Sequence, residues 1–155
     1  MRLARVFDVA AVNSILINPA IADQLCDDLS VGAQVSECES LEWIGVYVED
    51  QLSGVFLLVP KNGITVDIHT ALLPTVRGKQ SKQAGKMLLD LIFSHYHKAV
   101  TSVPENNRTA AWFAGSLGFR HEGVNRQSFL KNGVLLDQIM MGMTREDYLC
   151  QRQQH

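Results

Sequence analysis

Three features are scarce in this chain of 155 residues, and each scarcity excludes a class of protein. Cysteine occurs three times, at spacings that match no metal-binding or redox motif, so we expect no disulfide framework and no metal site. The longest apolar runs, such as Val55 to Val59, are far too short to span a bilayer. The formal net charge is only −2, which leaves no electrostatic footprint for binding nucleic acid. We interpret Cys26, Cys38 and Cys150 as structural residues.

The remaining composition is that of an ordinary soluble domain. Hydrophobic residues make up 46% of the chain and charged residues 19%, and the length is sufficient to bury a core. No internal repeat or long linker divides the sequence, so we expect a single domain over residues 1–155, with a polar tail from about Thr144. Asp8 interrupts the apolar run that a secretory signal would need, so a cytoplasmic location is expected.

The first forty residues predict a short strand followed by two short helices. Residues 1–7 alternate as a strand, and Asp8 then caps a helix that ends near Asn18, because the residue before a proline is pushed out of the helical region. Asn18 as N-cap, with Pro19 at the first helical position, predicts a second helix up to about Asp27. Residues 28–40 are expected to form a loop.

Three strands separated by turn signals come next, at residues 43–49, 55–59 and 64–72. The turns between them are expected at Asp50–Gly54 and Lys61–Gly63, the second of which contains an Asn-Gly pair. These strands should therefore form an antiparallel meander. The middle strand is apolar on both faces, which places it centrally under helices.

The next segments predict helix, strand and helix. From about Gln83 the apolar spacing becomes helical and stays so to His97, and residues 99–103 then form a short buried strand. Asn107 is expected to cap a short helix over residues 108–115.

The last two strands, at residues 120–130 and 134–143, should form a hairpin around the pair Asn132-Gly133. Because a helix connects strand 64–72 to strand 99–103, those two strands should run parallel. The predicted fold class is therefore α/β in the mixed α+β sense. Its central, mostly antiparallel sheet contains one parallel strand pair and is flanked by helices.

Positive charge is concentrated between strand 64–72 and the following helix. No Asp or Glu lies between Ile68 and Leu89, whereas this segment contains Arg77, Lys79, Lys82 and Lys86. A helix start exposes unpaired backbone N–H groups and the positive end of the helix dipole, so a strand, a Gly-containing basic loop and a helix predict an anion site, with phosphate as the ligand. The alternative is a solvated, Lys-rich surface turn.

Asp67 and His69 are the candidate proton-transfer residues. They stand two positions apart on a strand and therefore point to the same face. A histidine beside a carboxylate is suited to removing a proton near neutral pH. The alternative is a half-buried histidine that hydrogen-bonds a backbone carbonyl. His95 and His97 diverge on a helix, so they predict no metal site.

Two motifs resemble those of the GNAT superfamily of acyl-CoA-dependent N-acetyltransferases, and the resemblance covers nearly the whole chain. The first is Leu72-Leu-Pro-Thr-Val-Arg-Gly-Lys79, similar to the family's hydrophobic strand end and acetyl-CoA pyrophosphate loop. The second runs from Val103-Pro-Glu-Asn-Asn107 to Leu117-Gly-Phe-Arg-His-Glu-Gly123 and looks like the family's strand, Asn-led helix and L-G-F-x-x-E-G segment. The resemblance implies the acyl-CoA N-acyltransferase fold, with acetyl-CoA as cosubstrate and an amine as acceptor.

The resemblance also implies the residues of the site. Those that would bind acetyl-CoA are Leu72, Leu73, Arg77, Gly78, Lys79, Gln80, Ser81, Lys82, Gln83, Ala84, Gly85 and Asn107. His69 and Asp67 lie near the position where family members place a general base, with His69 as the base and Asp67 as its orienting partner. The sequence departs from the family pattern at Gln80 and Lys82, where small residues belong. It departs again at Ala114, where many members have a tyrosine that acts as general acid.

These features leave three kinds of function open. The first is an N-acetyltransferase that moves an acetyl group from acetyl-CoA to a primary amine (a protein N-terminus, a lysine or a small amine) by direct attack. The second is a GNAT-fold protein that binds but does not catalyse. The third is a catalytically inactive GNAT-fold protein of a bacteriophage, because residues 68–70, 77–79 and 107–119 together resemble GNAT-like proteins of tailed bacteriophages. Such a protein would act in particle assembly in the host cytoplasm, with phage structural proteins as partners. The oligomeric state stays open, with a homodimer among the alternatives.

Overall fold

Helices flank a seven-stranded sheet in this protein, for which we describe a computed structural model covering residues 1–30, 32, 34–37 and 41–153. The strands are hydrogen-bonded in the order β1-β2-β3-β4-β5-β7-β6. The elements are β1 (Arg2–Arg5), α1 (Val9–Leu16), α2 (Ala22–Leu25), β2 (Glu42–Val48), β3 (Gln51–Pro60), β4 (Thr65–Leu72), α3 (Lys79–His95), β5 (Lys98–Pro104), α4 (Arg108–Leu117), β6 (Arg120–Lys131), β7 (Val134–Thr144) and α5 (Arg145–Gln153). Some of the predictions concern residues outside these ranges. They are the prediction for Cys38, part of the expected loop 28–40, and the last two residues of the expected tail.

The parallel pair predicted from the crossover is present. Thr65, Val66 and Asp67 of β4 stand opposite Lys98, Ala99 and Val100 of β5 in parallel register. Four further pairings, β1–β2, β2–β3, β5–β7 and β6–β7, are antiparallel. The predicted fold class, a mostly antiparallel mixed sheet with one parallel pair and flanking helices, is therefore confirmed.

The chain divides into two compact units. The first consists of Met1–Val59 with Ile68–Ala84, and the second of Pro60–Asp67 with Gly85–His155. The chain passes from one unit to the other three times, at the last residue of β3, inside β4 and inside α3. That all 155 residues form a single domain stays a prediction.

The core of the first unit joins α1, β2 and β3. Val12, Ile15, Trp43 and Val55 are buried together in one apolar cluster. Asp8 caps α1 as predicted, since its carboxylate accepts hydrogen bonds from the backbone N–H groups of residues 10 and 11. The expected second helix is shorter than predicted and begins at Ala22 instead of residue 19.

The reason for the late start of α2 lies in the turn that precedes it. The side-chain oxygen of Asn18 accepts from Ala20 N–H at 3.0 Å, and its backbone oxygen accepts from Ile21 and Ala22 N–H at 3.0 and 2.9 Å. These bonds close a turn around Pro19 before the helix starts, because Asn side chains favour such local turns.

The turn between β2 and β3 was predicted at the wrong place. The chain reverses at Glu49 and Asp50, whose φ angles are 49° and 63°, and β3 already begins at Gln51. Gly54 therefore lies inside a strand, where a Cβ atom would be 2.6 Å from Cδ2 of Leu72 and 2.9 Å from the carbonyl oxygen of Ala71. This glycine is needed for close approach of backbones and not for a turn.

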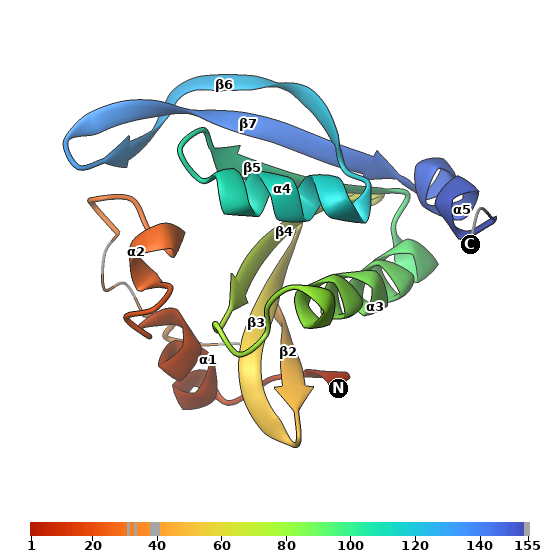
Figure 1. The fold of residues 1–155 in the computed structure, drawn as a ribbon, viewed down its shortest axis with the longest axis horizontal. Helices are drawn as coiled ribbons and strands as arrows, with labels where there is room; N and C mark the ends of the chain where they lie inside the picture. Colours follow the sequence, from red (N-terminus) through yellow and green to blue (C-terminus); the bar gives the residue numbers. More distant parts are fainter. Residues whose placement is uncertain (31, 33, 38–40, 154–155) are drawn as a thin grey trace. The chain divides into compact units, whose positions relative to one another are not determined.

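The hairpin of β6 and β7 dominates the second unit. Figure 1 shows it as a long twisted ribbon that ends beside α5. Its turn lies at Asn132 and Gly133 as predicted, with φ angles of 51° and 72° that suit a two-residue hairpin turn. Asn107 caps α4 as predicted, and Gly118 ends that helix in the left-handed region at φ 100°.

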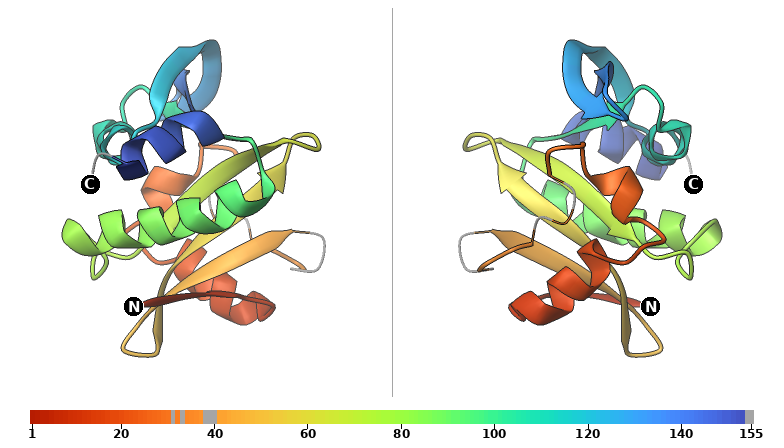
Figure 2. Two further views of the ribbon diagram at one scale, coloured as in Figure 1. Left: turned by 90° about the vertical axis from the view of Figure 1, so that its right-hand side faces the viewer. Right: turned by 90° about the vertical axis from the view of Figure 1, so that its left-hand side faces the viewer.

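The expected polar tail from Thr144 is instead helix α5, which Figure 2 shows from two sides at the end of the hairpin. Thr144 and Asp147 cap the start of this helix reciprocally. The Asp147 carboxylate accepts hydrogen bonds from the backbone N–H and the hydroxyl of Thr144. In return, the Thr144 hydroxyl oxygen accepts a hydrogen bond from the backbone N–H of Asp147. The ring of Tyr148 stacks on Phe93 of α3 at 4.9 Å, and its hydroxyl donates to Asp90. Burial and that hydrogen bond raise the pKa of Tyr148 above its usual value.

Candidate functional site

The predicted anion site lies at the start of α3, but its backbone differs from the predicted loop. The helix begins at Lys79, four residues before the predicted start at Gln83. Lys79, Gln80, Lys82 and Gln83 are exposed, so the first turns of the helix carry little apolar periodicity that a sequence pattern would reveal. Of the residues expected to hold the cofactor, Leu72 ends β4, Leu73 to Gly78 form the turn, and Lys79 to Gly85 are helical.

The turn that leads into α3 is tightly held. The backbone N–H of Leu73 donates to Ser53 of β3 at 2.9 Å, and that of Val76 donates to Leu73 at 2.8 Å. The Val76 side chain is buried and anchors the turn in the first unit. Gly78 adopts φ 62°, and no atom lies within 4 Å of the position that its Cβ would occupy. The glycine thus supplies a left-handed conformation with open space beside it.

Some of the backbone donors at this helix start are already used. Gln80 N–H donates to the Arg77 carbonyl at 3.3 Å, and Lys82 N–H to the Gly78 carbonyl at 3.2 Å. The hydroxyl of Ser81, which is buried, also donates to the Gly78 carbonyl, at 2.9 Å. The Lys82 bond is the ordinary i→i−4 bond of a helix, so the Gln80 N–H is the one first-turn donor among these that is withdrawn from an anion.

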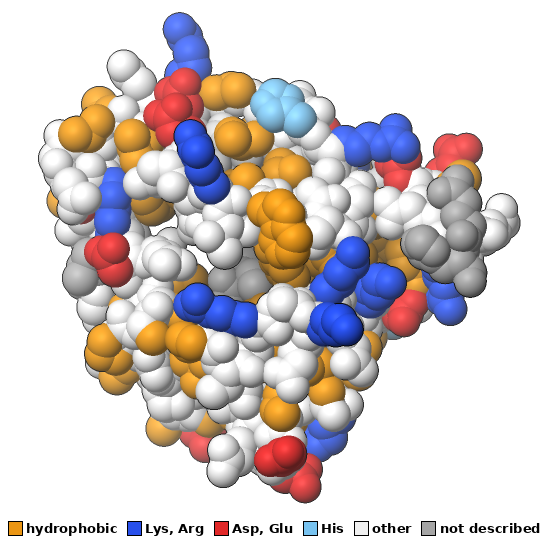
Figure 3. All heavy atoms as spheres, viewed as in Figure 1, with side chains coloured by type: hydrophobic (Ala, Val, Ile, Leu, Met, Phe, Trp, Pro, Cys, Tyr) orange, Lys and Arg blue, Asp and Glu red, His pale blue; other side chains and the backbone are white. Residues whose placement is uncertain are grey.

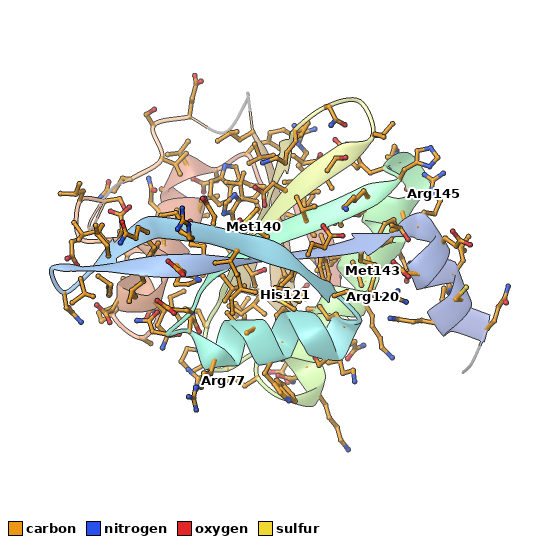
Figure 4. All side chains as sticks on the ribbon, turned by 90° about the horizontal axis from the view of Figure 1, so that it is seen from above. Arg77, Arg120, His121, Met140, Met143 and Arg145 are labelled. Atoms are coloured by element: carbon orange, nitrogen blue, oxygen red, sulfur yellow. The ribbon has the colours of Figure 1, made fainter. Side chains whose placement is uncertain are left out.

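The electrostatics of the helix start favour an anion. The first turn of α3 contains no acidic residue, so nothing there neutralises the positive end of the helix dipole. Arg77, Lys79 and Lys82 are all exposed. In Figure 4 the labelled Arg77 side chain extends away from the ribbon into solvent. Figure 3 shows that basic side chains elsewhere on the viewed face are interspersed with apolar and acidic ones.

Gly85, which was expected to approach the cofactor, serves helix packing. A Cβ atom on Gly85 would lie 2.6 Å from Cδ1 of Leu117 in α4. Both residues belong to the second unit, where α3 and α4 touch at this point. Close packing against Leu117 is therefore sufficient to explain why residue 85 is a glycine, and no bound ligand is needed for that explanation.

Asp67 is the better held of the two proton-transfer candidates. Its side chain is 17% exposed, and Oδ2 lies 3.8 Å from Nζ of Lys61. Oδ1 is buried and has no hydrogen-bond partner among the described residues. Asn62 fixes the adjoining turn, because its side-chain oxygen accepts from the N–H groups of Ile64 and Thr65. A buried acceptor without a partner costs about 1–3 kcal/mol, so such groups are often kept for function.

His69 is exposed, two positions further along β4 on the same side of the strand. No hydrogen bond or ion pair holds its ring among the described residues. The alternative of a half-buried histidine that satisfies a backbone carbonyl therefore finds no support, and neither does an orienting bond from Asp67.

At the N-cap of α4, the Asn107 side-chain oxygen accepts from Ala110 N–H at 3.0 Å, which leaves its NH₂ group and the second lone pair of the oxygen for a ligand. Ala114 is buried and provides no general acid at the position where many GNAT members have tyrosine. Trp112 of α4 is 66% exposed, because the buried residues of this helix, Ala114 and Leu117, lie on another face.

Two kinds of feature are not found in the described part of the chain. Among residues 1–30, 32, 34–37 and 41–153, no group of three or more His, Cys, Asp and Glu side chains is placed to hold a metal ion. No helix within these ranges is long and apolar enough to cross a membrane.

The fold is that of the GNAT N-acetyltransferases. Spermidine N-acetyltransferase from Vibrio cholerae, solved in complex with CoA and spermine, matches with a TM-score of 0.74 at 17% identity, over 95% of this chain and 98% of that one. A chimera of the Vibrio cholerae enzyme and hSSAT matches with a TM-score of 0.77 at 19% identity, over 97% and 99%. Ribosomal-protein-alanine N-acetyltransferase from Brucella melitensis matches with a TM-score of 0.72 at 13% identity, over 93% and 99%.

Within this fold, residues 30–154 match the family model described as "Protein of unknown function (DUF2824)", and the chain belongs to that family. No curated protein matches the sequence.

Proposed function

We propose that this protein is an N-acetyltransferase that moves an acetyl group from acetyl-CoA to a primary amine. The observation that carries the proposal is the start of α3, where an acid-free first turn, the exposed Arg77, Lys79 and Lys82, and open space at Gly78 occur within six consecutive residues. This arrangement suits the pyrophosphate of CoA, because a helix start with basic side chains binds phosphate. The GNAT fold and the CoA-bound Vibrio cholerae relative support the same ligand.

In this proposal the segment Leu72 to Gly85 holds the cosubstrate. Gly78 and the first-turn N–H groups of α3 that remain unpaired would face the phosphates, and the three basic side chains would pair with them. These side chains compensate for backbone N–H groups that are not free to bind phosphate, because they already donate to the carbonyl oxygens of Arg77 and Gly78. CoA itself supplies the acetyl thioester.

The chemistry that remains for the chain is proton transfer. The amine nitrogen attacks the thioester carbonyl, a C–N bond forms and the C–S bond breaks. An amine that arrives protonated must first lose one proton to free its lone pair, and the Asp67 carboxylate is suited to take that proton, since Oδ1 accepts no hydrogen bond from the described residues. A second proton passes from nitrogen to solvent when the amide forms. The CoA thiolate leaves and is protonated from solvent, because Ala114 offers no acid.

A cationic acceptor fits the charge pattern of residues 7–59. Every charged residue between Val6 and Pro60 is acidic: Asp8, Asp23, Asp27, Asp28, Glu37, Glu39, Glu42, Glu49 and Asp50. Negative potential of this kind attracts amines in their protonated form. The spermidine N-acetyltransferase from Vibrio cholerae, which shares this fold, was solved with CoA and spermine.

A second candidate function is a non-catalytic role for the GNAT fold in bacteriophage particle assembly. Three observations favour it: Gly85 is committed to packing on Leu117, the Gln80 and Lys82 N–H groups are used internally, and no general acid replaces tyrosine at Ala114. The link to bacteriophages rests on sequence resemblance alone. In this role the protein would bind phage structural proteins in the host cytoplasm.

Calorimetric titration with acetyl-CoA, followed by mass spectrometry of a panel of polyamines, lysine peptides and N-terminal peptides, separates the two functions. Binding of acetyl-CoA and a mass increase of one acetyl group on any amine are expected. Absence of acetyl-CoA binding contradicts the enzyme and leaves the assembly role. Binding without acetylation of any amine contradicts catalysis but keeps the cosubstrate site.

A further inference from the structure

Strand β6 forms one edge of the sheet. It is the last strand in the hydrogen-bonded order and, among the described strands, pairs with β7 alone. Every residue from Arg120 to Gln127 except Gly123 is exposed. An exposed edge strand offers unpaired backbone N–H and C=O groups to a strand of another molecule, and natural proteins keep such edges short or interrupt them. The other edge, β1, has only 4 residues, whereas β6 has 12, so shortness cannot protect β6.

One interruption of β6 lies at Glu122. This residue is extra, because the β7 partners of His121 and Gly123 are consecutive residues. Its carboxylate lies over β7, where a Cβ atom on Gly142 would be 2.5 Å from Cδ and from both carboxylate oxygens. Oε1 accepts a hydrogen bond from Nζ of Lys98 in β5 at 2.7 Å. The bulge thus turns a charged side chain inward across the sheet, which disfavours a further strand outside β6.

A larger interruption lies at residues 126–128. Between the pair Asn125–Gln138 and the pair Phe129–Leu136, β6 has three residues and β7 has one. The middle residue of the three, Gln127, adopts φ 50°, which is uncommon for a residue with a side chain. Figure 1 shows the β6 ribbon bowing away from β7 between the ends of the hairpin. Such a backbone persists only where its surroundings hold it.

Asp137 of β7 holds this bulge. Its Oδ1 accepts a hydrogen bond from the backbone N–H of Gln127 at 2.8 Å, and the Ser128 hydroxyl donates to the Asn125 carbonyl at 2.8 Å. Asp137 is itself fixed by Glu105, which follows β5. Its backbone N–H donates to Oε1 of Glu105 at 3.0 Å, and its carbonyl accepts from Glu105 N–H at 3.0 Å. All of these residues belong to the second unit, and together they form a bulge with a dedicated carboxylate.

We propose that the bulge at residues 126–128, held by Asp137, prevents β6 from pairing edge to edge with β6 of a second copy of this chain. The two interruptions leave no regular run of more than three residues on this strand. Pairing of two edges needs a longer straight run, because a bulge leaves residues unpaired and bends the strand. A second copy is the occupant that is excluded, since each molecule presents the same edge to every other molecule. The inference does not depend on CoA binding or catalysis.

A chain that lacks Gln127 and Ser128 tests the proposal. The deletion leaves Arg126 opposite Asp137 and makes the ladder regular through the middle of the hairpin, with opposite charges in a favourable cross-strand pair. The net charge is unchanged, because both deleted residues are uncharged. Sedimentation velocity should show association that grows with concentration and exceeds that of the wild type. Hydrogen exchange at the outer amides of β6 should slow as the chains associate.

Two point variants separate release of the edge from general loss of stability. Asp137→Ala removes the carboxylate that accepts from Gln127 N–H, so it should increase association. Glu105→Ala is the matched control, because it makes the same change in net charge and removes a neighbouring hydrogen bond but leaves the Gln127–Asp137 bond in place. It should lower the urea midpoint of unfolding and sediment as the wild type does. Gln127→Gly should raise that midpoint without association, because glycine adopts positive φ freely.

Four outcomes overturn the inference. The first is a deletion variant that unfolds cooperatively in urea and sediments as the wild type does at every concentration. If the deletion variant does not fold, Asp137→Ala decides, and its sedimentation as the wild type is the second such outcome. The third is equal association of Glu105→Ala and Asp137→Ala, which would make general destabilisation the cause. The fourth is a wild-type dimer in which the outer amides of β6 are protected from exchange, since the edge would then be an interface.

Discussion

A Cβ atom added to Gly85 of α3 would lie 2.6 Å from Cδ1 and 2.9 Å from Cδ2 of Leu117 in α4. The two helices can approach this closely only because residue 85 has no side chain. Leu117 is buried, so its side chain has little freedom to move away. A glycine that the GNAT resemblance assigns to phosphate binding is thus accounted for by packing.

Two glycines in helix interiors should respond in opposite ways to alanine. Gly85→Ala should lower the free energy of unfolding by about 1 kcal/mol, since the overpacking cost exceeds the gain in helix propensity. Gly115→Ala should raise it by about 0.5–1 kcal/mol, because no atom lies within 4 Å of the new methyl group. Equilibrium urea denaturation of both variants measures the two changes. A stabilised Gly85→Ala protein would show that α3 and α4 are less tightly packed than described.

Charge reversal at the start of α3 should weaken acetyl-CoA binding. In Lys82→Glu a charge-assisted bond to phosphate is replaced by repulsion, and we expect affinity to fall by roughly 10- to 150-fold. The matched control is Arg126→Glu on β6, which changes the net charge equally and should bind as the wild type does. Calorimetry at fixed ionic strength makes the comparison, because exposed charges are screened by salt. Equal affinities for Lys82→Glu and the wild type would remove Lys82 from the phosphate site.

Asp67 and His69 can be separated by turnover. Asp67→Asn should lower the single-turnover rate by about 10²- to 10⁴-fold with acetyl-CoA affinity unchanged, because a general base is lost. His69→Gln should do less, since its exposed ring is held by no described residue. The sequence alone had favoured His69 as the base and Asp67 as its orienting partner, which predicts the larger loss of turnover for His69→Gln. A larger loss in His69→Gln would restore the histidine as the base.

Asp67→Asn should also leave the free energy of unfolding unchanged or raise it. The native carboxylate keeps one buried oxygen without a partner, and its ion pair with the half-exposed Lys61 is long. Lower activity in a protein at least as stable is the mark of a residue kept for function. Clear destabilisation of this variant, measured in urea, would point instead to a structural role for the carboxylate.

The cap of α5 should make stability depend on pH. Hydrogen bonds from Thr144 lower the pKa of Asp147 below its ordinary value of 3.8, and the nearby Arg120 acts in the same direction. Because the pKa of Asp147 is lower in the folded state than in the unfolded state, its carboxylate stabilises the fold fully at pH values above the unfolded-state pKa. This stabilisation is lost as the pH falls through the folded-state pKa of Asp147. The cap contributes about 1 kcal/mol.

Urea denaturation from pH 7 to pH 3 checks this dependence. The difference in unfolding free energy between the wild type and Asp147→Ala should be constant above about pH 5 and should shrink below about pH 4. Thr144→Ala is the matched variant, because it removes the other half of the cap and should show a similar loss at pH 7. A difference that persists undiminished at pH 3 would mean that the carboxylate charge does not stabilise α5.

Much of the fold could be predicted from the sequence because its signals are local. The caps at Asp8 and Asn107 and the turn at Asn132-Gly133 depend on residues within a few positions of one another, and each is found where expected. The parallel pairing of β4 with β5 followed from the order of elements and the crossover helix. The basic start of α3 was visible as a run without acidic residues.

The sequence by itself thus determined the fold class, the strand alternation and the charge of the candidate site, since composition and spacing within one segment suffice for them. Only the tertiary structure decided the roles of Gly54 and Gly85, because glycine in a sequence shows a missing side chain but not which distant backbone or side chain fills the space. The tertiary structure also decided the position of α5, because this helix docks on Phe93 and Asp90, which lie more than fifty residues away in the sequence. It likewise decided the state of Asp67, because only the surrounding fold leaves one carboxylate oxygen buried without a hydrogen-bond partner among the described residues.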